Sequence, residues 1–170
     1  LFTLVLAPGL TARAQNRVGL DELDLAAMSC GWERPQARQA VGGNPLKIAR
    51  NKFERGVGTH APSWFAIDTG GEALNFEAQV GLDDEELVRG KGSAVFRIYA
   101  DGRLAADSGV MHARQPARRI TADLAGVRVV VLEVSDAGDG SAHDHADWCD
   151  AFFTVRDGAV LKPLPRPPTE

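Results

Sequence analysis

The sequence lacks the marks of several protein classes. No apolar run reaches the about 18 residues that a membrane-spanning helix needs, and no glycine-rich phosphate loop joins a strand to a helix. Positive charge is not in excess either, since the net charge over 170 residues is −4. We therefore expect one globular domain with no membrane and no nucleic acid as partners.

Cysteine is nearly absent, and Cys30 and Cys149 are the two present. In an oxidising compartment they could form a disulfide that closes a loop of on the order of a hundred residues, which would stabilise the fold by roughly 4–5 kcal/mol. Two buried free thiols are the alternative. The sequence does not decide between the two states.

Both ends of the chain differ in composition from its middle. Residues 1–10 are apolar and precede Ala12-Arg13-Ala14, a pattern typical of the end of a secretory signal peptide, although an edge strand or a disordered leader is also open. Proline is concentrated in residues 163–168, which favours an extended linker to an attached domain. We therefore divide the chain into a leader (1–16), a β-sandwich (17–157) and a linker (158–170), and we expect a secreted or periplasmic protein.

The hydrophobic pattern between these ends has a period of two residues. In residues 74–82, apolar and polar side chains alternate as in a strand with one buried face. Further strands are expected at residues 64–68, 95–100, 120–124, 127–134 and 151–155, and a hairpin turn at Asp101-Gly102. Residues 21–28 are the one helical candidate. This pattern predicts an all-β fold, a jelly-roll β-sandwich of two antiparallel sheets with little helix.

An enzymatic interpretation starts from His143, His145 and Asp147, whose spacing resembles the metal-binding loop of metallo-β-lactamase-like hydrolases. That family continues with a second histidine where this chain has Trp148, and no histidine follows. No serine or cysteine stands in a recognisable nucleophile turn. We therefore expect no catalytic residues and keep the metal-dependent hydrolase as the least favoured hypothesis.

The same region is easier to explain as a binding site. A sugar ring needs an exposed aromatic platform and a few fixed donors and acceptors. Trp148 is the candidate platform, His60 could bind a hydroxyl group, and Asp84 or Asp147 could accept from two adjacent hydroxyls. A core position for Trp148 and a structural role for His60 are the alternatives.

The segment DAGDGSAHDHAD resembles a calcium site in composition, because Ca²⁺ binds carboxylate and carbonyl oxygens. Asp136, Asp139 and Asp144 are the candidate ligands. Solvated aspartates without an ion are an equally good interpretation.

Five motifs, in order, resemble the NPCBM family, carbohydrate-binding module family 51. They are GGNPLKI at 42–48, FERGVGTHAPS at 53–63, VGLDDE at 80–85, VFRIYADGRLAADSGVM at 95–111, and DAGDG with DHADWCDAFF within 136–153. The resemblance implies a jelly-roll sandwich, usually with bound calcium, that recognises terminal galactose-type sugars.

The family resemblance also implies roles for particular residues and partners. By carry-over, His60, Asp147 and Trp148 line the sugar site and Asp84 lies close to it. The partners implied are galactose-containing glycans and the catalytic domain of a glycoside hydrolase in the same polypeptide, most similar in arrangement to an α-galactosidase. A structural spacer without sugar affinity is the alternative function.

Overall fold

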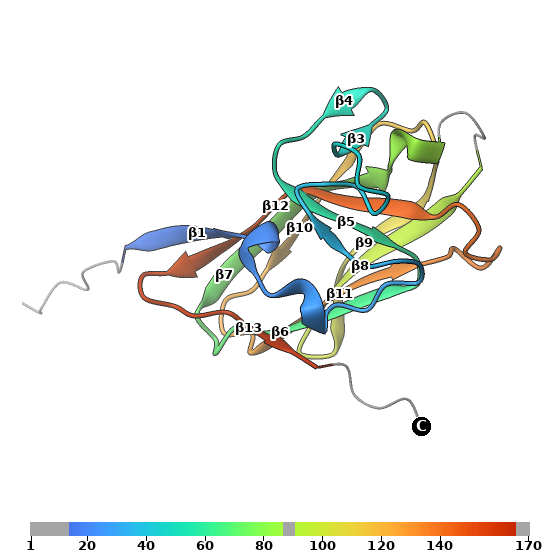
Figure 1. Cartoon of the computed structure of the whole chain (residues 1–170). Helices are drawn as coiled ribbons and strands as arrows, with labels where there is room; N and C mark the ends of the chain where they lie inside the picture. The colour runs from blue at the N-terminus through green and yellow to red at the C-terminus, as the bar shows by residue number, and fades with distance from the viewer. Residues whose placement is uncertain (1–13, 87–90, 166–170) are drawn as a thin grey trace, which may run out of the picture.

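The computed structural model describes residues 14–86 and 91–165, and these form a sandwich of two antiparallel sheets (Figure 1). Sheet A has the strand order β10-β7-β12-β5-β2, with β1 also paired to β12, and sheet B has the order β13-β6-β11-β8-β9. The prediction of an all-β sandwich with little helix is confirmed, since the helical elements within these residues are three 3-10 turns. No helix in the described part of the chain is long and apolar enough to cross a membrane.

The strand bounds are as follows. Sheet A contains β1 (Gln15–Gly19), β2 (Gln36–Ala37), β5 (Gly56–His60), β7 (Ala73–Leu82), β10 (Arg118–Asp123) and β12 (His145–Arg156). Sheet B contains β6 (Ser63–Asp68), β8 (Ser93–Ala100), β9 (Arg103–His112), β11 (Val129–Ser135) and β13 (Lys162–Leu164). A small hairpin of β3 (Lys47–Ile48) and β4 (Asn51–Lys52) contacts the turn η3 (Asp84–Glu86), and both stand at one end of sheet A (Figure 1).

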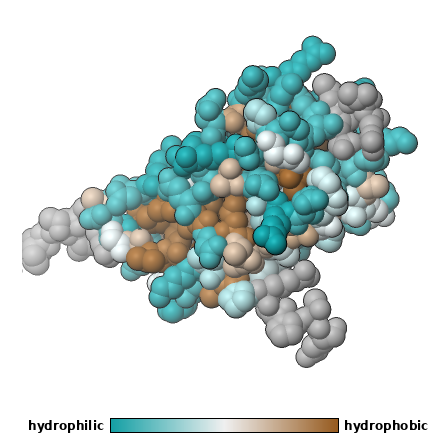
Figure 2. All heavy atoms as spheres, in the orientation of Figure 1, coloured by the Kyte–Doolittle hydropathy of each residue, from teal (hydrophilic) through white to brown (hydrophobic). Residues whose placement is uncertain are grey.

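The core lies between the two sheets and is built by strand alternation. Phe76 of β7 and Phe96 of β8 face each other across it, and both contact the indole of Trp148 on β12. Figure 2 shows that apolar side chains also gather along the open side of the sandwich between β1 and β13, where Leu23 and Leu25 pack against the core.

The helical candidate at residues 21–28 is not an α-helix. It forms two 3-10 turns, η1 (Leu20–Glu22) and η2 (Leu25–Ala27). Asp21 is buried and accepts hydrogen bonds from Arg38 (2.6 Å) and Arg55 (2.7 Å), and the side chain of Asp24 accepts from the amide of Ala26. These local bonds compete with a continuous helix.

The sandwich extends beyond the limits expected from the sequence. β1 begins at Gln15, and β13 pairs with β6 inside the segment assigned to the linker. The expected sandwich of residues 17–157 was therefore too short at both ends. The edge strands β1 and β13 have too few residues to show alternation in the sequence. Residues 1–13, on which the signal-peptide prediction rests, lie outside the described residues.

The hairpin predicted at Asp101-Gly102 joins β8 to β9. Both residues have positive φ, 47° and 77°. This is the geometry of a two-residue turn that matches the twist of the flanking strands. The Asp–Gly signal was therefore sufficient to place it.

Candidate functional site

Three aromatic rings from distant parts of the chain meet at one end of sheet A. His60 of β5 and His145 of β12 lie directly opposite each other, so both side chains leave the same face of the sheet, with ring centroids 5.3 Å apart. The indole of Trp32 stacks on His145 at 5.2 Å and lies 6.0 Å from the ring of His60. Because Trp32 is 46% exposed, an aromatic surface faces solvent here.

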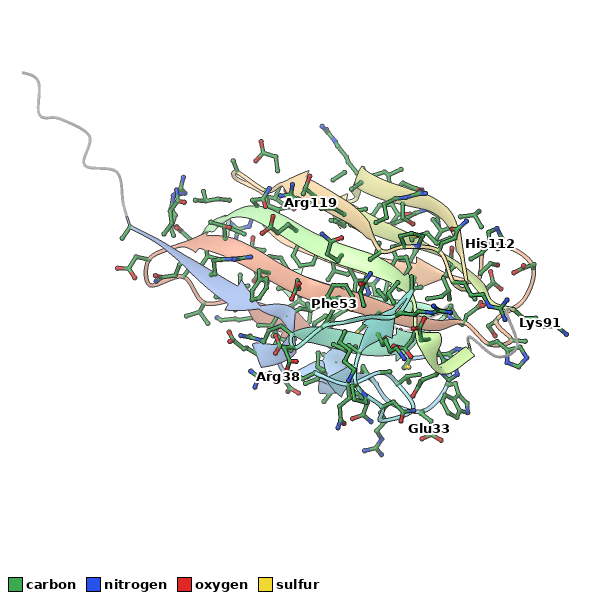
Figure 3. All side chains as sticks on the ribbon, turned by 90° about the horizontal axis from the view of Figure 1, so that it is seen from above. Glu33, Arg38, Phe53, Lys91, His112 and Arg119 are labelled. Atoms are coloured by element: carbon green, nitrogen blue, oxygen red, sulfur yellow. The ribbon has the colours of Figure 1, made fainter. Side chains whose placement is uncertain are left out.

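The loop that carries Trp32 is fixed by close contact with the end of β5. The amide of Gly31 donates to the carbonyl oxygen of His60 at 3.0 Å. A Cβ atom at position 31 would lie 2.2 Å from the carbonyl oxygen of Ala61, so only glycine permits this approach. Glu33, the next residue after Trp32, has a φ of 56° and lies at the rim of the molecule (Figure 3). Gly31 and Glu33 thus place Trp32 in a tight turn beside the end of β5.

Glu85 fixes the orientation of His145. Its carboxylate lies 2.8 Å from Nδ1 of His145 and also accepts from the side chain of Asn44 and the amide of Gly42. Burial alone would raise the pKa of Glu85, but these hydrogen bonds outweigh burial and lower it. An ionised Glu85 therefore accepts a hydrogen bond from Nδ1–H of His145, and Nε2 lies on the opposite side of the ring.

His60 is oriented by its own backbone. Its Nδ1 lies 2.7 Å from the carbonyl oxygen of Ala61, which can only accept, so Nδ1 carries the hydrogen and Nε2 is the acceptor of the neutral ring. The site thus combines a half-exposed indole with two oriented imidazoles. That combination suits a ligand with one apolar face and a rim of hydroxyl groups.

Two carboxyl groups are buried together beside this site, on the outer face of sheet A. Asp147 of β12 lies between Gly58 and Gly81 of the neighbouring strands, and segment 39–48 passes directly over those glycines. Asp83 lies within hydrogen-bonding reach of Asp147 and accepts from the amide of Lys47 at 2.9 Å. Burial, reinforced by the neighbouring Asp83, raises the pKa of Asp147 well above its usual value. Neither carboxylate oxygen of Asp147 receives a hydrogen bond from a described residue.

The profile of the NPCBM/NEW2 domain matches residues 16–154. This chain belongs to the NPCBM/NEW2 family. It is thus a carbohydrate-binding module, a non-catalytic domain type that occurs within larger glycoside hydrolases.

Two curated proteins are similar to this NPCBM domain. A putative endo-alpha-N-acetylgalactosaminidase of Renibacterium salmoninarum is 35% identical over 147 residues, which is 83% of this chain and 10% of that protein. Alpha-1,3-galactosidase B of Akkermansia muciniphila is 33% identical over 122 residues, 69% of this chain and 15% of that protein. The chain therefore spans a small part of the length of these relatives.

Two solved structures share the fold closely. The family 51 module of Clostridium perfringens GH95, in complex with methyl-galactose, is 30% identical with a TM-score of 0.74, covering 81% of this chain and 99% of that one. The second family 51 module of Clostridium perfringens ZmpB, in complex with GlcNAc, is 29% identical with a TM-score of 0.76, covering 84% and 32%. The sequence-based family resemblance is thereby confirmed.

The prediction that Trp148 is an exposed platform was wrong. Its side chain is fully buried, 5.2 Å from the ring of Phe96 and 6.1 Å from that of Phe76. Alternation along β12 explains this, because Trp148 and Ala146 face the core while Asp147 faces the opposite side. Asp147 is also fully buried and cannot reach a sugar at the surface.

The other two predicted sugar-site residues are placed differently from each other. His60 lies beside the Trp32 ring, as described above. The side chain of Asp84 is only 4% exposed, and one of its oxygens accepts from the amide of Arg50 at 2.8 Å. The role of Asp84 in this structure is therefore to hold the loop of the β3–β4 hairpin.

Two of the three residues predicted to bind calcium, Asp139 and Asp144, contact Ser93. Asp139 accepts from the Ser93 hydroxyl at 2.8 Å, and Asp144 accepts from its amide at 2.9 Å. Burial, opposed by the Ser93 hydrogen bond and reinforced by the charges of Asp139 and Asp136, raises the pKa of Asp144 to about 6. Within residues 14–86 and 91–165, no three acidic, histidine or cysteine side chains form a group that could hold a metal ion.

That finding also bears on the hydrolase hypothesis. His145 is paired with Glu85, and Asp147 is sealed under segment 39–48, so these residues do not form a shared metal site with His143. The family assignment places the chain among non-catalytic modules. Of the HxHxD residues, His145 and Asp147 share one face of β12 through strand alternation, whereas His143 stands in the turn before the strand with a φ of 74°.

Of the two cysteine states that the sequence left open, the structure has the free thiols, since Cys30 and Cys149 are not bonded to each other. Cys149 is fully buried on the outer face of β12 with Leu46 and Ile48, whereas Cys30 lies near Thr59, which faces Ala146. Three residues along a strand correspond to about 10 Å, and the two thiols also approach opposite faces of sheet A. This separation exceeds the about 7 Å that a disulfide can bridge.

The sequence analysis missed Trp32, Glu85 and Asn44, and it considered His145 only as a metal ligand. One signal could have found the first of these. Trp32 is the single aromatic residue in the polar segment GWERPQAR, which has no strand or helix period. An isolated aromatic residue in such a loop is a better candidate platform than one within a strand.

Proposed function

We propose that this NPCBM domain recognises terminal galactose-type sugars through Trp32, with His60 and His145 as the hydrogen-bonding groups. The observation that carries the proposal is the half-exposed indole that stacks on the oriented ring of His145 and lies beside that of His60. The apolar face of the sugar would cover the indole, and its hydroxyl rim would meet the two Nε2 atoms. The related module of Clostridium perfringens GH95, whose structure holds methyl-galactose, supports this choice of sugar.

Calorimetric titration of the chain with methyl-galactoside tests the proposal. We expect a Kd in the millimolar to micromolar range, roughly −4 to −8 kcal/mol. Replacing Trp32 with Ala should weaken binding by at least about tenfold, while the control Trp64→Ala, which alters a tryptophan of sheet B, should not. Equal affinity of Trp32→Ala and the wild type would contradict the proposal. No binding of any sugar on a glycan array would favour the spacer function instead.

The whole protein is proposed to be an exported glycoside hydrolase. Its relatives include glycosidases of which this module is a small part, and the similarity to alpha-1,3-galactosidase B favours an α-galactosidase catalytic domain in the same polypeptide. Secretion or location in the periplasm follows from the need to meet extracellular glycans. Fractionation of the native cells with mass spectrometry of the mature N-terminus tests the export.

A structural calcium ion is also proposed, and the geometry favours Asp83 and Asp147 over Asp136, Asp139 and Asp144. Three buried oxygens, both of Asp147 and one of Asp84, receive no hydrogen bond from a described residue, against one of Asp144. A bound cation would neutralise the Asp83–Asp147 pair. Backbone carbonyls and water would have to complete the six to eight oxygen ligands typical of Ca²⁺.

Thermal unfolding with calcium and with a chelator separates the two clusters. Calcium should stabilise the wild type and the control variant Asp139→Asn, but not Asp147→Asn. Loss of the calcium effect in Asp139→Asn alone would return the site to the Ser93 cluster. No calcium effect on the wild type would refute the proposed ion.

A further inference from the structure

The outer face of sheet B carries a continuous apolar row. Five residues lie opposite one another in register across all five strands. Residues paired in this way share one face of a sheet, and their neighbours in sequence, such as Phe65 and Ile98, face the core. The row, which we call the docking face, is Leu164, Ala66, Val131, Tyr99 and Leu104.

Part of the docking face is open to solvent. Leu104 is 56% exposed, whereas Ala66 in the middle of the row is buried. Val110 lies outside the row on the same strand as Leu104 and is 47% exposed. The adjacent row contains charged residues, but these are paired with one another, since Arg97 donates hydrogen bonds to both Asp107 and Glu133. Sheet B therefore offers apolar contacts and little unbalanced charge on its outside.

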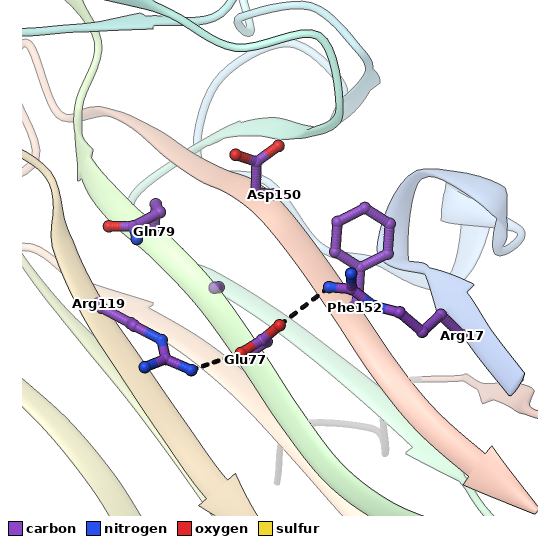
Figure 4. A pocket seen from close by; sticks show the side chains of 7 residues that line it. Arg17, Glu77, Gln79, Arg119, Asp150 and Phe152 are labelled. Atoms are coloured by element: carbon purple, nitrogen blue, oxygen red, sulfur yellow. Dashed lines mark hydrogen bonds and ion pairs between the residues drawn. The ribbon is translucent and has the colours of Figure 1, made fainter. Parts of the chain in front are cut away.

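Sheet A differs sharply on its outer face. Glu77 of β7 is bound by Arg17 on one side and Arg119 on the other, and Gln79 and Asp150 line the same hollow (Figure 4). This is the ordinary pattern of an antiparallel sheet with one face in the core and one in water. An apolar row on the outer face of sheet B, in addition to its core face, is instead typical of a sheet whose outer face is partly covered.

The position of the C-terminal strand indicates what covers it. β13 is the edge strand of sheet B, and Leu164 is itself a member of the docking face. The chain therefore leaves the sandwich beside this row, and a domain that follows in the polypeptide would be tethered at the edge of the docking face.

We propose that the outer face of sheet B docks a folded domain that follows residue 170 in the same polypeptide, through an apolar patch of that domain. This inference rests on the proposed attachment of the module to a glycoside hydrolase. It does not depend on the Trp32 site, which is built on sheet A. The docked module would hold its sugar site in a fixed direction relative to the next domain.

Hydrogen exchange on two proteins tests the proposal: the 170-residue chain alone and the complete natural polypeptide. Amides of β9, an edge strand, should exchange at least about tenfold more slowly in the complete polypeptide, because the covering domain excludes water from them. The variant Leu104→Arg should abolish this protection. The matched control Thr121→Arg, an exposed position on the edge strand β10 of sheet A, should retain it.

Other readouts keep the test decisive. Val131→Thr, a change of similar shape, should reduce the protection if Leu104→Arg fails to fold. Sugar affinity should be equal in Leu104→Arg and the wild type, so a failed docking test stays separate from a failed sugar site. Equal exchange of β9 in both proteins would overturn the proposal. So would a natural polypeptide that ends at Glu170, or a dimer of the isolated chain that Leu104→Arg dissociates.

Discussion

The two tryptophans Trp32 and Trp148 should respond to mutation in opposite ways. Replacing the buried Trp148 with Ala would leave a large cavity between Phe76 and Phe96. Such a loss costs about 3–5 kcal/mol of unfolding free energy. In a domain of this size the corresponding fall in Tm is roughly 10 °C or more. Trp32→Ala should cost no more than about 1 kcal/mol, because its ring is half exposed.

The variant Trp148→Phe refines the prediction. Phenylalanine keeps the edge contacts with the two neighbouring rings. It also removes a buried indole N–H that has no hydrogen-bond partner among the described residues. Because an unsatisfied donor costs about 1–3 kcal/mol, its removal should offset part of the cavity cost. Trp148→Phe is therefore expected to be clearly more stable than Trp148→Ala.

Guanidinium unfolding followed by circular dichroism measures these differences, and calorimetric titration with methyl-galactoside measures binding by the folded variants. The expected result is a stable Trp32→Ala that does not bind and an unstable Trp148→Ala. A Trp148→Ala variant that loses less than about 1 kcal/mol would refute the core position of this ring. If folded Trp148→Phe lost sugar binding while Trp32→Ala kept it in full, Trp148 would be the aromatic platform of the sugar site, as the sequence suggested.

Three further predictions concern the loops and the buried groups. Gly31→Ala should displace the Trp32 loop, because its Cβ would meet the carbonyl oxygen of Ala61 at 2.2 Å, and calorimetry should show weaker sugar binding. The pKa of Asp144 is raised to about 6, so the folded protein keeps a proton that the unfolded chain releases from about pH 4. The free energy of unfolding should therefore fall between about pH 4 and 6, by at most about 3 kcal/mol. In urea titrations with a chelator present, Asp144→Asn should lack this part of the pH dependence. A thiol reagent should label the half-buried Cys30 in the folded protein. It should label Cys149 only after unfolding, because this thiol is buried and burial raises its pKa. Equal labelling rates of the two cysteines would contradict the fold.

Much of the fold followed from local patterns in the sequence. Strands β7, β8 and β11 carry alternating or β-branched residues over many positions, and Asp101-Gly102 specifies its own turn. Strands β1 and β13 did not follow, because each is a short edge element held by pairing with a distant strand. With five and three residues, these strands are too short to show alternation.

The candidate site was harder to predict because its residues come together only through tertiary contacts. His60 was found from its motif, but its neighbours Trp32 and Glu85 lie in loops whose positions depend on packing. Glycine at position 31 was not recognisable as a close-approach residue until its contact with the carbonyl oxygen of Ala61 was known. Trp148 misled the prediction because polar neighbours in sequence point to the opposite face of the strand.

The alternation of β12 links the core to the binding site. Within one strand, Trp148 and Phe153 fill the core, while His145, Asp147 and Cys149 leave the opposite face. A shift of one residue in the pairing would exchange these two sets, burying an imidazole in the sandwich and exposing an indole. The large cost of that exchange fixes the register. The same apolar packing that stabilises the domain therefore determines that His145 stands opposite His60 and beneath Trp32.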